Sequence, residues 1–431
     1  KEAAMRKIRP FAAAPLAAFV LLVGAALGPA GAASPSDWPQ WLGPQRTGTS
    51  PATGVFSAGG PVRLRKVWSV PVESGWAGLA VAGGRLYTLA ADEQSDFALA
   101  LDAATGKEVW RTRLDPRYAA AENGPGSTPA VDGNLVFVMS PSCRLQALDA
   151  ANGSVVWQHH LKDEYGSGSH RRGCMTSPLV EGDLLVVQVS GETENRLMAF
   201  NKASGAVVWT SKGAGRTGPS SPIVADFGGV RQVVVNYLET LAPPLGGLYG
   251  AQLTDGTILW KHVLDKGFSF DTPLALPGDR LFLQTFNSDL RLLQVKAREG
   301  KLTADPVWVV SEQSTPNSPP VYHDGHLYGV GGDFLLCLNA ATGKPVWKEK
   351  IYAGSVILVD GHLVIQSQTA GLVRVVEATS AGYREKARLE ILTPGAPGNT
   401  PPSFADRRIY VRNAEEIAAV EVGVGETKAA Q

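Results

Sequence analysis

The chain has 431 residues, of which 44% are hydrophobic, and it contains 48 glycines and 29 prolines. So many turn-forming residues among short apolar runs favour an all-β fold with many turns. The 40 basic and 40 acidic side chains balance, which argues against nucleic acid or an anionic membrane surface as the main partner.

Residues 1–33 have the pattern of a secretory signal peptide. A basic segment at residues 5–9 precedes an alanine-rich apolar run at 11–27, and the small residues at 30–33 suit signal peptidase. Several prolines and a marginal apolar length disfavour the alternative, a membrane anchor. Cleavage leaves 40 − 4 = 36 basic against 40 − 1 = 39 acidic groups, a net charge of −3. No cysteine lies near the cleavage site, so we expect a periplasmic or secreted protein without a lipid anchor or membrane insertion.

Residues 34–63 precede the repeats and are predicted to form an aromatic strap or linker. Trp38 and Trp41 lie close together in this segment. Because paired tryptophans usually bury a large apolar area, we expect the strap to pack against one face of the fold. Stacking of a ligand on these rings is the alternative.

A phrase that ends in tryptophan recurs along the chain. It reads Ala-Leu-Asp-Ala-Ala-Thr-Gly-Lys-Glu-Val-Trp at residues 100–110 and returns at 147–157, 199–209, 251–260 and 337–347. The phrase indicates a strand, a polar turn whose glycine takes a positive φ, and a second strand. With two looser copies, the successive spacings lie between 39 and 52 residues, which is typical of four-stranded propeller blades. The tryptophans, all expected to be structural, are Trp68, Trp110, Trp157, Trp209, Trp260, Trp308 and Trp347.

A second phrase, a short apolar strand followed by an Asp-Gly-like turn, marks the innermost strand of each blade. The eighth blade ends at Val422 without a tryptophan strand, and residues 64–70 have the sequence of the missing strand. We therefore predict an all-β, eight-bladed β-propeller over residues 64–422, closed by the N-terminal strand, with a disordered tail at 423–431. The eight phrases lie near Gly78, Thr128, Ser177, Ser221, Thr272, Ser318, Ser355 and Thr400.

The Ala-x-Asp-x-x-Thr-Gly-x-x-x-Trp phrase resembles the tryptophan-docking motif of pyrroloquinoline-quinone-type propellers. The Trp-Pro-x-Trp-x-Gly phrase at 38–43 is similar to the leader of many exported members of that family. The resemblance covers most of residues 64–422 and implies that each tryptophan packs between adjacent blades. The fifth blade departs from the motif because its segment from Val295 to Trp308 is longer. The seventh departs because Gly382-Tyr-Arg-Glu-Lys carries no tryptophan.

Three cysteines, Cys143, Cys174 and Cys337, are too few for a disulfide framework. Cys143 and Cys174 fall in neighbouring repeats and could pair. We favour the alternative, in which all three are buried as small apolar residues.

The polar loops that enter the innermost strands are the candidate functional positions. Propellers bind ligands at the mouth of the central channel, and these loops would line a funnel suited to an anionic or sugar-like small molecule. A solvated polar rim that binds nothing is the simpler interpretation, and we favour it. The candidates are Glu122, Asn123, His170, Arg171, Arg172, Arg216, Asp271, Asn317 and Asn399.

The resemblance implies an enzymatic hypothesis, a quinoprotein (PQQ-dependent) dehydrogenase that oxidises alcohols or sugars. Such an enzyme needs calcium held by oxygen ligands, a carboxylate base and a flat aromatic group under the quinone. Glu122, Asp271, Asn317 and Asn399 could supply oxygens. The adjacent cysteines of many alcohol-oxidising members and a Cys-x-x-Cys-His haem motif are absent. We therefore expect no catalytic residues, no metal and no cofactor, with PQQ and calcium as the alternative.

The favoured hypothesis is a non-catalytic protein-interaction scaffold or ligand-binding module. The chain is similar to the scaffold propeller of the bacterial β-barrel assembly machinery, although it lacks the lipidation cysteine of that lipoprotein. The expected partner is an envelope protein or a small polar or anionic ligand, and the expected state is a monomer.

Overall fold

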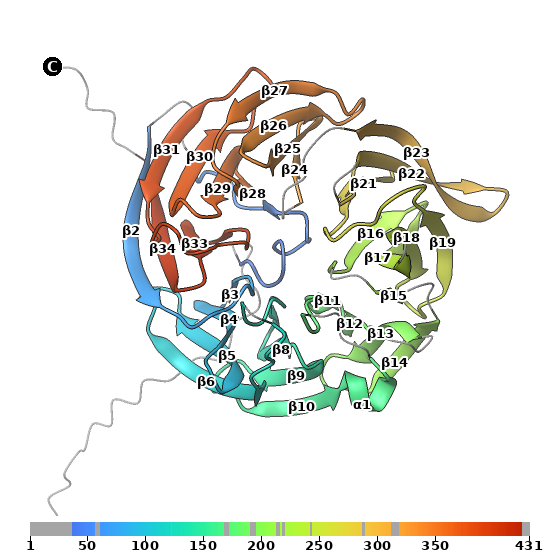
Figure 1. Ribbon diagram of the computed structural model, residues 1–431, viewed down its shortest axis with the longest axis horizontal. Coiled ribbons are helices and arrows are strands. Elements are labelled where there is room, and N and C mark those ends of the chain that lie inside the picture. The colour runs from blue at the N-terminus through green and yellow to red at the C-terminus, as the bar shows by residue number, and fades with distance from the viewer. Residues whose placement is uncertain are drawn as a thin grey trace, which may run out of the picture.

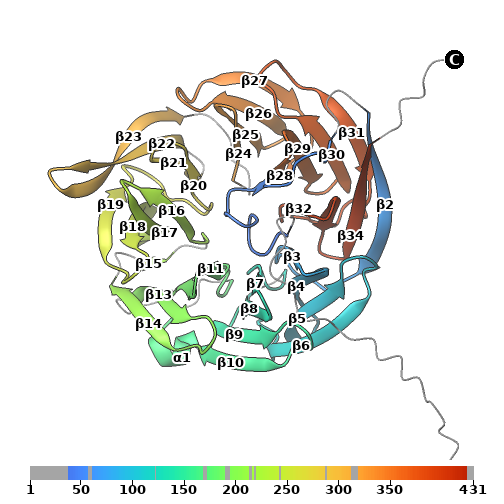
Figure 2. The same cartoon turned by 180° about the vertical axis from the view of Figure 1, so that it is seen from behind.

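Eight sheets surround a central axis as the blades of a closed ring in the computed structural model, and the four main strands of each are antiparallel (Figures 1 and 2). The one helix in the described part of the chain is the short α1 (Leu161–Tyr165). The prediction of an all-β, eight-bladed propeller with four-stranded blades is confirmed. The structure describes residues 37–56, 61–121, 123–167, 172–189, 195–212, 216–217, 220–241, 244–286, 289–311 and 319–424.

Each blade runs from a short innermost strand at the axis to an outermost strand at the rim. Blade 1 has β3 (Ala80–Ala82), β4 (Arg85–Ala91), β5 (Ser95–Asp102) and β6 (Glu108–Pro116); blade 2 has β7 (Ala130–Asp132), β8 (Leu135–Met139), β9 (Arg144–Asp149) and β10 (Val155–His160). Blade 3 has β11 (Leu179–Glu181), β12 (Leu184–Gln188), β13 (Asn195–Asn201) and β14 (Val207–Lys212); blade 4 has β16 (Ile223–Phe227), β17 (Val230–Leu241), β18 (Pro244–Gln252), β19 (Ile258–Val263) and the added β15 (Arg216–Thr217).

The other four blades repeat this order. Blade 5 has β20 (Leu274–Leu276), β21 (Arg280–Gln284), β22 (Asp289–Arg298) and β23 (Lys301–Ser311); blade 6 has β24 (Val321–His323), β25 (His326–Gly331), β26 (Phe334–Asn339) and β27 (Pro345–Lys350). Blade 7 has β28 (Gly354–Val359), β29 (His362–Ser367), β30 (Leu372–Glu377), β31 (Glu385–Glu390) and the added β1 (Thr49–Ser50); blade 8 has β32 (Ser403–Ala405), β33 (Arg408–Arg412), β34 (Glu416–Val424) and β2 (Val62–Pro71).

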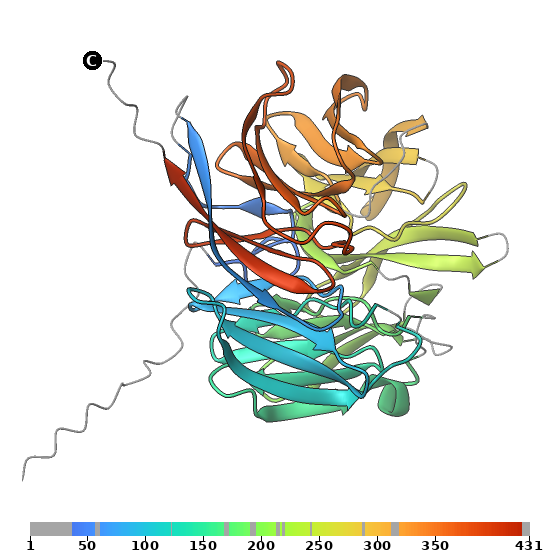
Figure 3. The same ribbon diagram turned by 60° about the vertical axis from the view of Figure 1, so that its left-hand side comes forward.

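The outermost strand of blade 8 comes from the N-terminal part of the chain. β2 pairs with β34 in antiparallel register, with Trp68 opposite Ala419, so the first described repeat strand completes the last blade (Figure 3). Residues far apart in sequence thus share one sheet, and no unpaired edge separates the first blade from the last.

The tryptophans join neighbouring blades by a repeated hydrogen bond. In six of seven cases the indole N–H donates to a main-chain oxygen in the polar turn of the next blade, as Trp110 does to Ala150. The six donor–acceptor pairs are Trp68 to Ala103 (3.1 Å), Trp110 to Ala150 (3.0 Å), Trp157 to Lys202 (3.0 Å), Trp209 to Leu253 (2.9 Å), Trp308 to Ala340 (3.1 Å) and Trp347 to Thr379 (2.9 Å).

The turn glycine of the repeat serves the same contact. Gly153 has a φ of 75°, and a Cβ placed there would come within 2.7 Å of the Trp110 ring. Glycine is therefore required at this position for two reasons, the backbone conformation and the close approach of the ring. The hydrophobic core lies between blades, and Trp110 packs there with Tyr87 of its own blade and Val136 of the next.

The fifth blade changes this contact. Its β22–β23 hairpin continues beyond the rim of the ring (Figures 1 and 2) and has no Thr-Gly turn to receive the preceding tryptophan. Trp260 of blade 4 instead donates to the Gln232 side chain of its own blade at 2.7 Å. The seventh blade, whose β31 carries no tryptophan, offers no such bond to blade 8.

Candidate functional site

The strap at residues 37–56 crosses the central channel (Figures 1 and 2). At its start, Trp38 exchanges two main-chain hydrogen bonds of 2.8 Å with Val81 of blade 1, and Pro39 accepts one from Val131 of blade 2. At its end, β1 pairs in parallel with β28 of blade 7. The strap therefore lies inside the ring, against innermost strands of blades 1, 2 and 7, rather than covering an outer face.

Arg46 holds the middle of the strap in place. Its side chain is 2% exposed, and the guanidinium donates to the main-chain oxygens of Pro222 at 2.9 Å, Ser177 at 3.3 Å and Pro178. Its Nε also donates to Gln40 within the strap at 3.2 Å. Burial lowers the pKa of Arg46 to about 9, so it keeps its charge at neutral pH. A buried cation thus ties the strap to blades 3 and 4 through neutral oxygens.

Above the strap, the loops that enter the innermost strands enclose a cavity of about 580 Å³, called here the mouth cavity. The strands of each blade are antiparallel, so these loops all lie on one face of the ring. Seven of the eight blades contribute to the wall, and Trp41 of the strap does as well. The lining residues are Trp41, Trp76, Gly126, Arg172, Met175, Ser177, Ser221, Phe270, Asp271, Thr272, Phe286, Pro319, Asn399 and Thr400.

The structure brings three of the predicted site residues together, Arg172, Asp271 and Asn399. Asn123 is half-buried and does not line the cavity. The backbone of Arg216, in β15, pairs with Leu238 of β17, and the Arg216 side chain lies outside the described part. The remaining four, Glu122, His170, Arg171 and Asn317, lie outside the described residues.

Aromatic and apolar walls are the part of the site that the loop analysis missed. Phe268, Phe270 and Phe286 contact one another with ring centroids 4.7–5.6 Å apart, and Phe270 and Phe286 remain 37% and 48% exposed. The candidates were chosen for polarity, whereas ligand pockets are lined mainly by apolar groups. Of the strap pair, Trp38 is buried in the core as expected, and Trp41 lines the cavity.

Asp271 is the carboxyl group of the mouth cavity. Its main-chain oxygen accepts hydrogen bonds from Asn236 (2.6 Å) and Ser220 (3.0 Å) of blade 4, which fix the loop. Its side chain accepts one from the Gln284 amide at 2.5 Å. Burial raises the pKa of Asp271 to about 7, and the Gln284 hydrogen bond offsets only part of this rise.

Replacing Asp271 with asparagine should stabilise the protein at pH 8 and have little effect at pH 4. An acid whose folded pKa is raised contributes stability at low pH, and that contribution is lost between its unfolded pKa of 3.8 and its folded pKa of about 7. We expect Asp271→Asn to raise the free energy of unfolding by about 2 kcal/mol at pH 8, since the side chain keeps some access to the cavity. Urea unfolding across this pH range measures the difference. A constant difference at all pH values would contradict the raised pKa.

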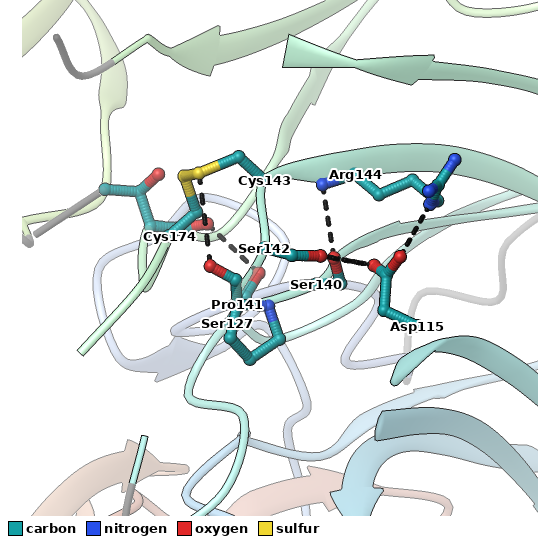
Figure 4. The surroundings of a disulfide bond; sticks show 9 residues. Asp115, Ser127, Ser140, Pro141, Ser142, Cys143, Arg144 and Cys174 are labelled. Atoms are coloured by element: carbon teal, nitrogen blue, oxygen red, sulfur yellow. Dashed lines mark hydrogen bonds and ion pairs between the residues drawn. A yellow bond between two sulfur atoms is a disulfide. The ribbon is translucent and has the colours of Figure 1, made fainter. Parts of the chain in front are cut away.

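Arg172 lies on the cavity wall in the loop before blade 3. Its guanidinium stacks 5.4 Å from the Trp76 ring centre. Two residues further on, Cys174 forms a disulfide bond with Cys143 of blade 2 (Figure 4). The preference for unpaired burial is therefore wrong for these two cysteines, because neighbouring blades bring their Cα atoms to 5.2 Å. Cys337 is a buried free thiol.

Polar contacts hold the Cys143 loop between β8 and β9. The Asp115 carboxylate accepts hydrogen bonds from Ser140 (2.5 Å), Ser142 (2.5 Å) and the Arg144 Nε (2.9 Å), as Figure 4 shows in part. The disulfide thus connects a fixed loop of blade 2 to the segment that carries Arg172 and Met175.

Removing the disulfide should destabilise the ring. The two cysteines are 31 residues apart, and for a closed loop of this length we expect Cys143→Ser with Cys174→Ser to lower the free energy of unfolding by about 3 kcal/mol. Thermal unfolding with and without a reductant measures it. The native protein should lose stability in the reductant, and the double variant should not respond; equal responses would contradict the assignment.

A second cavity, of about 530 Å³, lies on the other side of the strap. Gln40 and Arg46 line it together with the turns that follow the innermost strands of blades 3, 4 and 5. The charged side chains there include an ion-pair group in which Arg231 contacts Glu181 (2.7 Å) and Asp226 (3.0 Å). The strap therefore separates two cavities, and only the mouth cavity contains predicted site residues.

Neither a metal centre nor a membrane-spanning helix is found among the residues that the structure describes. No three His, Cys, Asp or Glu side chains there are grouped so that they could hold a metal ion. The one helix of that part, α1, lacks the length and apolar character needed to cross a membrane.

Comparison with known proteins places the chain among related propellers. The family model described as outer membrane protein assembly factor BamB matches residues 64–212, 123–349 and 254–428. No curated protein matches the sequence.

Solved structures share the fold at low sequence identity. BamB from Moraxella catarrhalis is 15% identical with a TM-score of 0.56, and the alignment covers 86% of this chain and 100% of that one. The quinohemoprotein alcohol dehydrogenase from Comamonas testosteroni is 14% identical with a TM-score of 0.68, over 92% and 82% of the two chains. A europium-containing methanol dehydrogenase is 13% identical with a TM-score of 0.53, over 90% and 98%. Because the family matches together span residues 64–428, the chain belongs to the pyrroloquinoline-quinone-like propeller family that the BamB model describes.

Proposed function

We propose that the protein is a non-catalytic binding module of the cell envelope that holds a small ligand in the mouth cavity. The observation that carries the proposal is the convergence of loops from seven blades on one cavity of about 580 Å³. This volume lies in the range of small-molecule sites, and the mixture of aromatic walls with a few charged and amide groups is typical of them. Support for an envelope location comes from the family description and from the signal-like sequence of residues 1–33.

A panel of amines, carboxylic acids, sugars and aromatic alcohols tests this proposal by thermal unfolding. A ligand that binds only the folded state raises the melting temperature by mass action. We expect the rise to be lost when Phe270 and Phe286 are both replaced with alanine, because these rings form the exposed wall. Tyr352→Ala is the matched control, since Tyr352 is also an exposed aromatic residue but does not line the cavity. A panel without effect, or equal shifts in all variants, would contradict a ligand site at the mouth.

The described part of the mouth cavity does not fit a calcium-bound quinone cofactor. Calcium takes six to eight oxygen ligands, whereas the described wall offers one carboxylate, Asp271, and the amide of Asn399. The cysteine pair also differs from the adjacent pair of many alcohol-oxidising members, because Cys143 and Cys174 come from different blades. We therefore expect no cofactor absorbance and no dye reduction with alcohols or sugars after PQQ and calcium are added.

Protein docking is a second candidate, favoured by the exposed Phe270 and Phe286 rings at the mouth. Exposed aromatic residues are common anchors of protein interfaces, and the family description is consistent with such a role. A photo-crosslinking residue at position 286, compared with one at position 352, tests this in intact envelopes. A discrete product at 286 alone would favour docking, and identical products at both positions would exclude it at this surface.

A further inference from the structure

The carboxyl group of Asp271 has no counter-ion among the described residues of the mouth cavity. Its side-chain partner is the neutral amide of Gln284, and no ion pair to Asp271 forms within the described part of the chain. Arg172 is the other ionisable side chain among the described lining residues. It comes from blade 3, two blades away from Asp271, and its guanidinium lies over Trp76.

A carboxylate that is buried without a partner charge is costly to ionise. A charge removed from water costs free energy unless a partner charge or several hydrogen bonds replace the lost solvation. Here one amide hydrogen bond replaces only part of it, which is why the pKa of Asp271 rises to about 7. A cation that enters the cavity would supply the missing partner, so it would bind together with ionisation of the group.

The walls next to Asp271 favour an organic cation over a metal ion. Phe270 is its neighbour in sequence, and Phe286 packs edge-to-face with Phe270, with ring centroids 5.1 Å apart. Trp41 is held below by a 2.9 Å hydrogen bond from its indole N–H to Thr272. Aromatic faces attract ammonium and guanidinium groups, whereas a calcium ion would need oxygens that these rings do not provide.

We propose that the ligand of the mouth cavity is a small organic cation, an amine or a guanidine, that pairs its charge with Asp271 and packs its apolar part against Phe270 and Phe286. This inference rests on the binding function proposed above and narrows it to one class of ligand.

Three probes of similar shape and different charge test the proposal. Benzylamine is cationic at neutral pH, benzyl alcohol is neutral, and benzoate is anionic. Titration calorimetry with the full chain at pH 7 should show benzylamine binding at least about tenfold more tightly than benzyl alcohol, the factor that one pKa unit of stabilisation represents. Benzoate should bind no better than the alcohol.

The number of protons released on benzylamine binding distinguishes a carboxylate that pairs with the ligand from one with a purely structural role, which would release none. At pH 6 the free Asp271 is mainly protonated, so binding of benzylamine should release close to one proton, and at pH 8.5 it should release almost none. The affinity for benzylamine should therefore rise by up to about tenfold per pH unit below pH 7 and level off above it. Calorimetry in two buffers of different ionisation enthalpy measures the proton count.

Matched variants separate the outcomes. Asp271→Asn keeps the shape and should lose both the benzylamine preference and the proton release. Asp183→Asn, which removes a 91% exposed carboxylate in the turn between β11 and β12 that does not line the mouth cavity, should change neither. Tightest binding of benzoate, equal binding of all three probes, or no binding of benzylamine would overturn the cation inference. The proposed binding function would survive that result if binding of a neutral or anionic ligand still depends on Phe270 and Phe286. If no compound binds in a way that depends on these two rings, the binding function fails together with the cation inference.

Discussion

Replacing Arg46 with alanine is expected to lower the free energy of unfolding by about 4 kcal/mol, since removal of one partner from a buried charged network leaves the others unsatisfied. The guanidinium is the shared donor to oxygens of Ser177, Pro178 and Pro222. Without it these oxygens stay buried, and the strap loses its connection to blades 3 and 4. Urea unfolding measures the loss, and limited proteolysis should show faster cleavage between residues 37 and 56.

The neighbouring residue provides the control for this experiment. Gln45 is exposed and lies in the same turn, so Gln45→Ala should change stability by no more than about 0.5 kcal/mol. Arg46→Met keeps much of the side-chain volume and removes the donors, which separates packing from hydrogen bonding. If the methionine variant is as stable as the native protein, the hydrogen bonds do not hold the strap. Because Trp41 forms part of the cavity wall, the alanine variant should also bind mouth-cavity ligands more weakly.

The blades could be predicted from the sequence because the information that specifies them is local and repeated. Each copy of the phrase carries a glycine and a tryptophan at fixed spacing, and the structure uses both in the same contact between neighbours. The altered docking at Trp260 also follows from a local departure, the long segment that forms β22 and β23.

The position of the mouth cavity follows from the same repeat, whereas its chemistry does not. Arg172, Asp271 and Asn399 occupy equivalent loops, so topology alone brings them to one face. The environment of Asp271 depends on Gln284 from the next strand of its blade and on Asn236 from another blade. No spacing in the sequence encodes those contacts.

The strap and the disulfide show the same limit. Arg46 occurs once and bonds to residues 131 and 176 positions away, so no periodicity identifies its partners. Cys143 and Cys174 were recognised as a possible pair, but their distance depends on how two blades pack. The small number of cysteines favoured unpaired burial, whereas the packing of blades 2 and 3 brings Cys143 and Cys174 close enough to form a disulfide bond.

Removing a docking tryptophan is the other substitution with a large expected effect. Trp110 is 7% exposed, packs in the core between blades 1 and 2, and donates its indole N–H to Ala150. We expect Trp110→Ala to lower the free energy of unfolding by about 4 kcal/mol, the cost typical of truncating a buried aromatic side chain. Val109 precedes it on the same strand and is 43% exposed, so Val109→Ala should cost no more than about 0.5 kcal/mol.

A double-mutant cycle with Gly153 tests whether the repeat glycine and the tryptophan act as one unit. Gly153→Ala should destabilise the native protein for three reasons, the positive φ of 75°, a Cβ 2.7 Å from the Trp110 ring and the same Cβ 2.5 Å from the Thr112 hydroxyl. In the Trp110→Ala background the collision with the ring disappears, while the backbone strain and the close approach to the Thr112 hydroxyl remain. The double variant should therefore lose less stability than the two single variants lose together, by about 1 kcal/mol or more, as expected for residues in contact. Strict additivity would mean that the glycine is needed for the turn alone, and the recurrence of the two residues at fixed spacing would then not reflect the contact between blades.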